Sequence, residues 1–287
     1  MIKRDPKELF WQVNGLTLSG LSWGDDRLPP LLMLHGWLDN AASFSLLAPL
    51  LTDYYVVAVD LTGHGQSDQR SADANYQIWD DLPEIIGVLE QLAWADFDLL
   101  GHSRGAIIAT LLASSFPEKI KHLALLDAIA PQAVPEQEFP GQLRKYLEQN
   151  PPLLQAKNRV FSDLKDAVQR RKKNGLNEAA AQLIVERGLT ICDGGMTWTT
   201  DRRLYGASAV KLTAGQIQAV LKNLTMPALL LLAEGGSMAL AEELKSTRDA
   251  APQLQIEFVV GGHHFHMESS VASIADRIQH FLGGDNI

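Results

Sequence analysis

The sequence predicts an α/β fold in which helices cover both faces of a mostly parallel central sheet. Short continuous apolar runs of strand length recur along the chain, as expected of strands buried on both faces. Segments with helical spacing separate these runs, and this alternation is typical of parallel sheets. A third observation, a long stretch without a strand pattern, predicts a large insertion into the fold.

The first predicted elements form a hairpin. Residues 8–13 and 16–23 are short amphipathic runs, and the dipeptide Asn14-Gly15 separates them. An Asn-Gly dipeptide tolerates the positive φ angles of a two-residue turn between antiparallel strands. We therefore expect an antiparallel hairpin ahead of the parallel strands.

The remaining strands and helices follow in chain order. Strands are expected at residues 31–34, 55–59, 97–100, 120–126, 228–233 and 256–260. Helices are expected at residues 43–51, 75–94 and 106–116, and after each of the last two strands. Ser43 is the predicted N-cap of the first helix. The helix at 106–116 is apolar nearly all round, so we expect it to be buried.

Residues 131–224 interrupt this alternation. They contain no clear strand pattern, and Gln, Lys, Arg and Ala become more frequent. A segment of this length is too long for a simple connection and needs packing of its own. We expect a mostly helical lid subdomain here, with residues 1–130 and 225–287 forming the core that carries the sheet.

The composition argues against several classes of protein. With 46% hydrophobic and 21% charged residues, the chain is typical of globular proteins. Its formal net charge of −9 argues against a nucleic-acid binder, which needs a basic surface. The longest apolar run, residues 227–233, is too short to span a membrane, and the N-terminus is not typical of a signal peptide. The single cysteine, Cys192, rules out an internal disulfide, and we expect a cytoplasmic location.

The motif with the clearest chemistry is Gly101-His102-Ser103-Arg104-Gly105, which fits G-x-S-x-G between a predicted strand and a predicted buried helix. In this context the turn is so tight that both glycines are needed and the serine is exposed. Ser103 would lie at the N-terminus of the helix, where unpaired amides and the positive end of the dipole point. This pattern indicates a nucleophile; the alternative is a serine that only caps the helix.

Two further motifs extend the pattern. Leu34-His35-Gly36-Trp37 is similar to a His-Gly turn that supplies an oxyanion-hole amide, and residues 60–67 are similar to a D-x-x-G-x-G-x-S loop. Together with the serine motif, they make the chain resemble the α/β-hydrolase superfamily, in its lidded serine-hydrolase and carboxylesterase-like branch. The resemblance runs from about residue 30 to the end, with residues 131–224 unmatched. It implies the α/β-hydrolase fold and a reaction that needs neither cofactor nor metal.

The resemblance also implies a histidine base after the last strand. Three histidines compete there, His263, His264 and His266. Relatives often have an acidic residue five positions after the histidine, and Glu268 stands at that spacing from His263, although Ser270 replaces the usual proline. His263 is therefore the first choice, His264 the second, and His266 a structural residue. A metal site is the alternative for this cluster, because histidine is a frequent ligand.

The acid is where the sequence departs from the superfamily. Its usual position falls in the stretch Ala233-Glu234-Gly235-Gly236-Ser237, where Gly236 replaces the aspartate. Some members place the acid after the strand that precedes the lid, and Asp127 ends that strand here. Asp127 is the first choice and Glu234 the second. Alternatively, Asp127 accepts a hydrogen bond that anchors the lid.

The oxyanion hole is expected from two backbone amides, those of Trp37 and Arg104. Losing such a donor typically costs about 3 kcal/mol of transition-state stabilisation. His35 and Gly36 would shape the turn that aims the first amide. The side chain of Trp37 could serve only in core packing.

A serine at this turn favours acyl transfer to water, so we expect cleavage of small-molecule carboxylic esters through an acyl-enzyme on Ser103. Two alternatives stay open: a C–C bond hydrolase that uses the same residues, and a degenerate member that only binds a ligand or protein. The lid would select the substrate, and Met196, Trp198 and Tyr205 are candidates to line its pocket. The lid could also mediate a homodimer.

Overall fold

The computed structural model describes residues 5–234 and 241–284, without the side chains of residues 241–243. Its centre is an eight-stranded sheet with the order β1-β2-β4-β3-β5-β6-β10-β11. These strands are β1 (Lys7–Val13), β2 (Leu16–Trp23), β3 (Pro30–Leu34), β4 (Tyr55–Val59), β5 (Phe97–His102), β6 (Ile120–Leu126), β10 (Ala228–Ala233) and β11 (Leu254–Val259).

Most neighbouring strands of this sheet are parallel. The pairs from β4 through β3, β5, β6 and β10 to β11 all run in the same direction. Only β1 with β2 and β2 with β4 are antiparallel. At the hairpin turn, Asn14 has φ 52° and Gly15 has φ 81°, as expected for the Asn-Gly turn. The predicted fold class, with its mostly parallel sheet, is confirmed.

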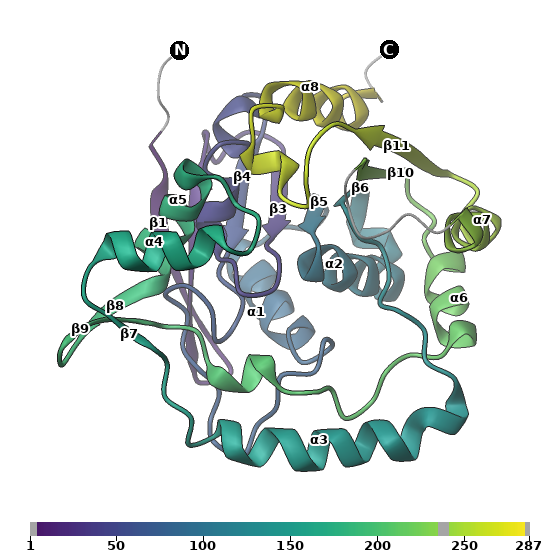
Figure 1. The fold of residues 1–287 in the computed structure, drawn as a ribbon. Coiled ribbons are helices and arrows are strands. Elements are labelled where there is room, and N and C mark those ends of the chain that lie inside the picture. Colours follow the sequence, from purple (N-terminus) through teal and green to yellow (C-terminus); the bar gives the residue numbers. More distant parts are fainter. Residues whose placement is uncertain (1–4, 235–240, 285–287) are drawn as a thin grey trace.

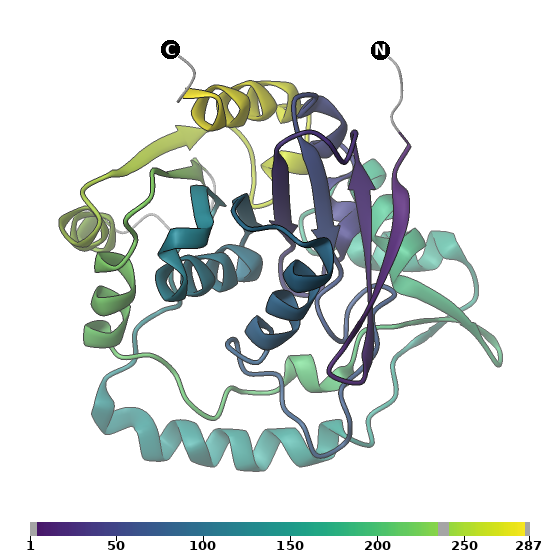
Figure 2. The ribbon, with the colours of Figure 1, turned by 180° about the vertical axis from the view of Figure 1, so that it is seen from behind.

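Two hydrophobic cores cover the two faces of the sheet. Leu32 and Leu34 of β3 belong to the core under α1 (Leu82–Leu92) and α2 (Arg104–Ser115). Met33, on the opposite face of the same strand, packs in the core under α8 (Val271–Leu282). This alternation along one strand is what places helices on both sides of the sheet (Figures 1 and 2). Among the described residues, no helix is both long and apolar enough to cross a bilayer, and the location of the chain stays a prediction.

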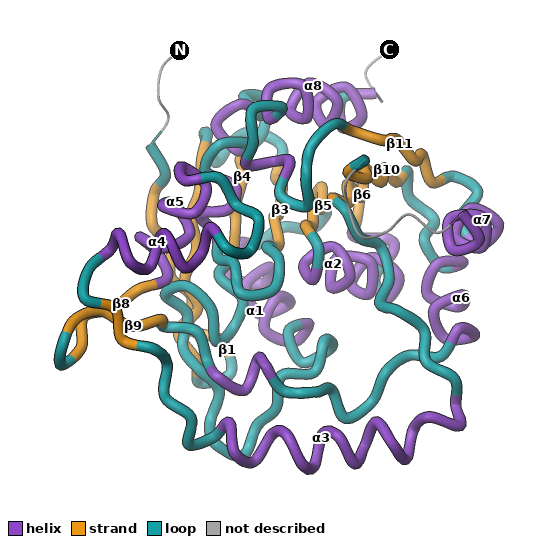
Figure 3. The backbone as a smooth tube through the Cα atoms, in the orientation of Figure 1, coloured by secondary structure: helices purple, strands orange, loops and turns teal. Residues whose placement is uncertain are grey.

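Residues 131–224 fold into helices and a small second sheet (Figure 3). The helices are α3 (Phe139–Leu153), α4 (Leu164–Lys172), α5 (Glu178–Gly188) and α6 (Ala214–Lys222). The strands β7 (Val160–Phe161), β9 (Gly195–Trp198) and β8 (Leu189–Cys192) pair in that order as an antiparallel sheet. We expected no strand here; each strand has at most four residues, which is too short to show a clear alternation.

The four helices of this segment pack in different places. Residues of α4 and α5 share a small core of their own with Phe161 of β7 and Met267. Leu221 of α6, together with Leu224, instead belongs to the core under α2. Helix α3 buries no residue, and it lies at the end of the molecule opposite α8 (Figures 1 and 2).

Two expected helices differ from the structure. Residues 43–51 form two short 3₁₀ helices, η1 (Ala41–Phe44) and η2 (Ala48–Leu50), and the N-cap of η1 is Asn40 rather than Ser43. The helix expected from residue 75 begins only at Leu82. A tertiary contact explains the later start, because the hydroxyl of Tyr76 donates to Asp201 (2.8 Å) and so draws residues before α1 toward the 131–224 segment.

Candidate active site

Ser103 lies at the tight turn between β5 and α2. Its backbone has φ 52° and ψ −117°, a combination that costs free energy for a residue with a side chain. A Cβ at Gly101 would overlap the carbonyl oxygen of Gly105, and a Cβ at Gly105 would overlap that of Leu34. Both glycines are thus required by contact, because any side chain at either position would collide with the backbone. The backbone amide of Ser103 donates to Leu126 of β6 (2.9 Å), which helps to hold the turn.

A continuous chain of short contacts connects Ser103, His263 and Asp127. His263 follows β11, and its Nε2 is 2.9 Å from Ser103 Oγ. Its Nδ1 is 2.6 Å from Asp127 Oδ2, and Asp127 directly follows β6. The structure therefore brings together the residues that were the first choices for nucleophile, base and acid. They come from the carboxyl ends of three parallel strands, where α/β sheets place their ligand sites.

Asp127 is held by contacts on both carboxylate oxygens. It is 2% exposed and has φ 55°. Oδ2 faces His263, while Oδ1 accepts a hydrogen bond from the backbone amide of Ala233 at 2.9 Å. Ala233 is the last residue of β10, the strand after which relatives usually place the acid. The carboxylate thus reaches the usual edge from the neighbouring strand and is fixed there by a backbone donor.

The second choices for the acid and the base, Glu234 and His264, make other contacts. Glu234 is exposed, and its backbone amide donates to Val259 at 3.0 Å. Gly236, which replaces the usual aspartate, lies outside the described residues. His264 Nε2 faces Asp39 Oδ2 at 3.3 Å instead of Ser103.

The backbone amides of Trp37 and Arg104 are both available to a ligand. Arg104 is the first residue of α2, where amides have no partner within the helix. No described residue accepts a hydrogen bond from either amide nitrogen. His35 is buried under this turn: its Nδ1 donates to Gly36 O (2.8 Å) and its Nε2 accepts from Leu61 N (3.0 Å). Burial lowers the pKa of His35, so the ring is neutral, as both hydrogen bonds require.

The side chains of the same two residues do not pack in the core. Trp37 is 48% exposed, and its indole Nε1 donates to the carbonyl oxygen of Leu204 at 3.0 Å. Its ring also meets Tyr205 edge to face, with 5.6 Å between the centroids. The alternative of core packing for Trp37 is therefore wrong. Arg104 Nη2 donates to Asp81 Oδ2 at 2.9 Å.

An ion pair joins the loop at residues 60–67 to helix α5. Asp60 is fully buried and accepts from the amides of Ala41 (2.7 Å) and Gln66 (2.9 Å). It also accepts from Arg187 Nε of α5, at 2.9 and 3.1 Å to its two oxygens. A Cβ at Gly65 would overlap the Asp60 carboxylate, which explains this glycine. The motif therefore supplies Asp60 to a buried ion pair that holds α5 against the sheet.

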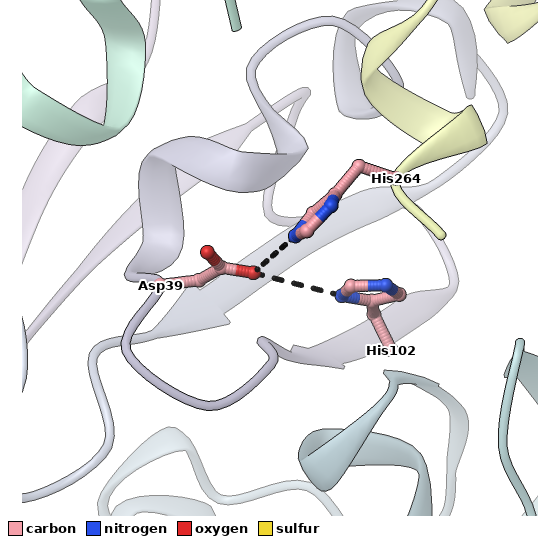
Figure 4. A group of neighbouring side chains, drawn as sticks. All are labelled: Asp39, His102 and His264. Atoms are coloured by element: carbon pink, nitrogen blue, oxygen red, sulfur yellow. Dashed lines mark ion pairs between the residues drawn. The ribbon is translucent and has the colours of Figure 1, made fainter. Parts of the chain in front are cut away.

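A second polar cluster contains Asp39, His102 and His264 (Figure 4). Its two histidine rings lie beside that of His263, and the sequence analysis missed Asp39. One Asp39 oxygen, Oδ1, bonds to Arg171 of α4. The other, Oδ2, lies 3.3 Å from His264 Nε2 and 3.7 Å from His102 Nδ1. The opposite nitrogen of His102, Nε2, donates to the backbone carbonyl of His263 at 2.8 Å. No spacing rule could find this set, because its members come from separate parts of the chain.

Burial sets the protonation of this cluster. Desolvation holds the pKa of His102 well below its ordinary value, and it lowers the pKa of His266 to about 3. Burial by itself would raise the pKa of Asp39, but the contact with His264 and the charge of Arg171 hold it well below its ordinary value. His102 and His266 are therefore neutral, and Asp39 is ionised. His266 is fully buried, with its ring centroid 4.2 Å from that of His102.

Comparisons with known proteins agree with this architecture. A family model described as alpha/beta hydrolase fold matches residues 29–270. Human serine hydrolase-like protein 2 is 32% identical over 289 aligned residues, which cover 92% of this chain and 90% of the relative. A crystal structure of a hypothetical protein from Pseudomonas aeruginosa PAO1 is 34% identical with a TM-score of 0.91, covering 98% of this chain and all of that one.

A further solved structure, the thioesterase domain from the curacin biosynthetic pathway, is 27% identical with a TM-score of 0.84. The match covers 96% of this chain and 99% of that domain. These relatives support a hydrolase. With a family model that matches most of its length and a relative above 30% identity over nine-tenths of it, the chain belongs to the α/β-hydrolase fold family.

Proposed function

We propose that this protein hydrolyses carboxylic esters of small molecules through an acyl-enzyme on Ser103. The observation that carries the proposal is the connected pair of contacts from Ser103 Oγ to His263 Nε2 and from His263 Nδ1 to Asp127 Oδ2. A serine hydroxyl becomes a useful nucleophile only when an adjacent base takes its proton, and the base needs a third group to orient it.

In the proposed reaction, Ser103 Oγ attacks the ester carbonyl while His263 Nε2 takes the hydroxyl proton. The negative oxygen of the tetrahedral intermediate lies between the amides of Trp37 and Arg104, at the positive end of the α2 dipole. Asp127 stabilises the imidazolium, and His263 then gives its proton to the departing alcohol. Water attacks the acyl carbonyl with His263 as base, which releases the acid and restores Ser103.

Part of residues 131–224 would cover this site as a lid. Among the described residues, polar contacts of Tyr146 with Asn75, of Gln142 with Ser208 and of Asn150 with Ala207 hold α3. A cavity of about 280 Å³ lies between α3 and the loop at residues 72–77. Because α3 buries no residue, few contacts would have to break for it to move. Helix α6 packs under α2, so we place the end of the lid before it, near residue 212.

The lid residues suggested for the substrate pocket differ in their surroundings. Tyr205 contacts the indole of Trp37, so it is close to the proposed oxyanion amide. The ring of Trp198 instead packs edge to face on Phe161, with 5.2 Å between the centroids, inside the small core of the lid. Met196 lies in β9 of the same small sheet. We therefore propose Tyr205 as the pocket residue among the three.

The test uses a fluorophosphonate, which reacts only with an activated serine, and intact mass as the readout. The wild type should gain a single adduct that Ser103→Ala loses. Ser115→Ala is the matched control, because Ser115 is an exposed serine at the other end of α2 and should leave labelling unchanged. An adduct that persists in Ser103→Ala would refute the assignment of the nucleophile.

A substrate panel then separates the alternatives. It contains esters of varied chain length, thioesters because a thioesterase domain is among the similar structures, and β-diketones for the C–C bond hydrolase. Turnover of β-diketones alone would replace ester hydrolysis by C–C cleavage. A folded wild type that gains no adduct would favour the ligand-binding protein.

A further inference from the structure

The cluster beside His263 has the donor set of a metal site. Asp39 Oδ2, His102 Nδ1 and His264 Nε2 all lie within 4.8 Å of one another (Figure 4). Asp39 and His102 are fully buried at their side chains, and His264 is the member that solvent reaches, with 13% of its side chain exposed. Imidazole nitrogens combined with one carboxylate oxygen are a typical ligand set for zinc.

The hydrogen bonds of His102 leave one of its nitrogens without a partner. A carbonyl oxygen can only accept, so the contact with His263 O requires that His102 Nε2 carry the proton. In a neutral ring, Nδ1 then presents a lone pair. That lone pair faces Asp39 Oδ2 at 3.7 Å, which is beyond hydrogen-bond length.

Both facing atoms are buried without a hydrogen-bond partner among the described residues. Two acceptors that face each other in a buried site repel, unless a positive centre lies between them. His102 Nδ1 therefore lacks a proton donor, and a cation between the three atoms would take the place of the single proton that His264 Nε2 can offer Asp39 Oδ2 at 3.3 Å.

The backbone leaves room for an ion at this place. A Cβ at Gly36 would lie 2.9 Å from both Asp39 Oδ2 and His102 Nδ1, so the absence of a side chain keeps the space between them open. The oxygen–nitrogen distances of 3.3 and 3.7 Å are close to the edge of a tetrahedron around zinc, about 3.4 Å for bonds of about 2.1 Å. Arg171 holds the opposite oxygen, Oδ1, and so orients the carboxylate as partners of metal ligands commonly do.

We propose that Asp39, His102 and His264 bind one divalent transition-metal ion of the zinc type, and that the bound ion slows the reaction at Ser103. The inference that the ion binds rests on the cluster alone. The inference that it slows the reaction rests on the proposed function. The site is inhibitory rather than catalytic, because the rings of its ligands His102 and His264 lie beside the ring of the base, His263.

The slowing has two physical causes. The ring centroids of His102 and His264 lie 4.8 and 5.1 Å from that of His263, so a doubly charged ion would oppose the positive charge that His263 acquires when it takes the serine proton. Coordination would also draw the two imidazole nitrogens together. Because His102 binds the carbonyl of His263 and His264 follows it in the chain, that shift would move His263 relative to Ser103.

The binding test titrates zinc chloride into chelator-treated protein by isothermal titration calorimetry. Wild type and Ser103→Ala should each bind one zinc ion per chain with the same affinity. His264→Ala should bind it at least tenfold more weakly, while His280→Ala, which removes an exposed histidine of α8, should bind as the wild type does. Thermal melting shows that each variant is folded, and His264→Gln repeats the test with a bulkier side chain.

Ser103→Ala separates this inference from the proposed function, because its zinc binding does not depend on hydrolysis. Equal affinity in His264→Ala and the wild type would overturn the site. Loss of binding in His263→Ala with retention in His264→Ala would also overturn it, since zinc would then occupy the Ser103 site itself.

The inhibition test measures the rate of fluorophosphonate labelling with and without zinc. Zinc should slow labelling of the wild type at least tenfold and leave the rate of His264→Ala within twofold of its own zinc-free value. Binding without any slowing in the wild type would refute the inhibitory role and leave the metal site in place. An anomalous-diffraction peak between the three ligand atoms in zinc-soaked crystals would support the position directly, and a peak elsewhere would refute it.

Discussion

Replacing Asp127 by asparagine tests whether the hydrogen-bond directions at this residue control the base. Asparagine has nearly the shape of aspartate, so the fold should persist. Its amide can take only one orientation, because the backbone amide of Ala233 donates to the position of Oδ1 and requires an oxygen there. The NH₂ group must then face His263 Nδ1, where the carboxylate now accepts.

The consequence is the wrong tautomer of His263. When Nδ1 accepts from asparagine, the ring proton moves to Nε2, which faces Ser103 Oγ at 2.9 Å and can no longer take its proton. Loss of the correct tautomer in a serine triad costs about 10⁴-fold in rate. That loss corresponds to about 5.5 kcal/mol of transition-state stabilisation.

The assay is kcat/KM on the best ester of the panel, with circular dichroism to confirm folding. Asp127→Ala removes the carboxylate without imposing a tautomer on His263. It should therefore lose no more activity than Asp127→Asn, although asparagine is the closer mimic of aspartate. Glu234→Gln is the control and should stay within twofold of the wild type, because Glu234 is exposed. Asp127→Asn within tenfold of the wild type, or a larger loss in Glu234→Gln, would refute the assignment of the acid.

Three further outcomes follow from the packing. Gly105→Ala should lower the free energy of unfolding by about 3 kcal/mol or more, measured in urea, because its Cβ would overlap a strand carbonyl. Arg187→Ala should cost about 3 kcal/mol in the same assay, because Asp60 is left as an uncompensated buried charge. Asp201→Asn should destabilise most at neutral pH: burial alone would raise the pKa of Asp201, but hydrogen bonds from Arg203 and Tyr76 hold it below the ordinary 3.8. A carboxyl with a lowered folded-state pKa stabilises above 3.8 and loses this contribution as the pH falls further, so the difference in melting temperature from the wild type should shrink in acid.

The parts of the fold that could be predicted are those with a local pattern. Strands β4, β6 and β10 match the expected ranges residue for residue, because continuous apolar runs are typical of strands buried on both faces. The tight turn around Ser103 was equally predictable, since only glycine fits at positions 101 and 105. Strand β7 was not, because two residues carry no periodicity.

Features set by distant contacts escaped prediction. The pattern of residues 75–94 is compatible with one helix, yet the bond from Tyr76 to Asp201 links residues 125 positions apart and favours a loop before Leu82. Asp39 belongs to a loop that carries no recognisable motif. Its role depends on contacts with His102, His264 and Arg171, which lie far from it in the sequence. Clusters of this kind can be recognised only in the folded structure, because no spacing along the chain encodes them.

The position of the proposed acid shows how a family motif can be missing while its geometry persists. Strands β6 and β10 are parallel neighbours with Leu126 opposite Leu231, so their carboxyl ends meet at one edge, about 4.8 Å apart. An aspartate at the end of either strand can reach the same histidine. At this edge Asp127 N donates to Leu231 O (2.8 Å), while Ala233 N donates back to its side chain. The backbone of β10 therefore orients an acid supplied by β6, which explains how Asp127 reaches His263 although Gly236 replaces the usual aspartate.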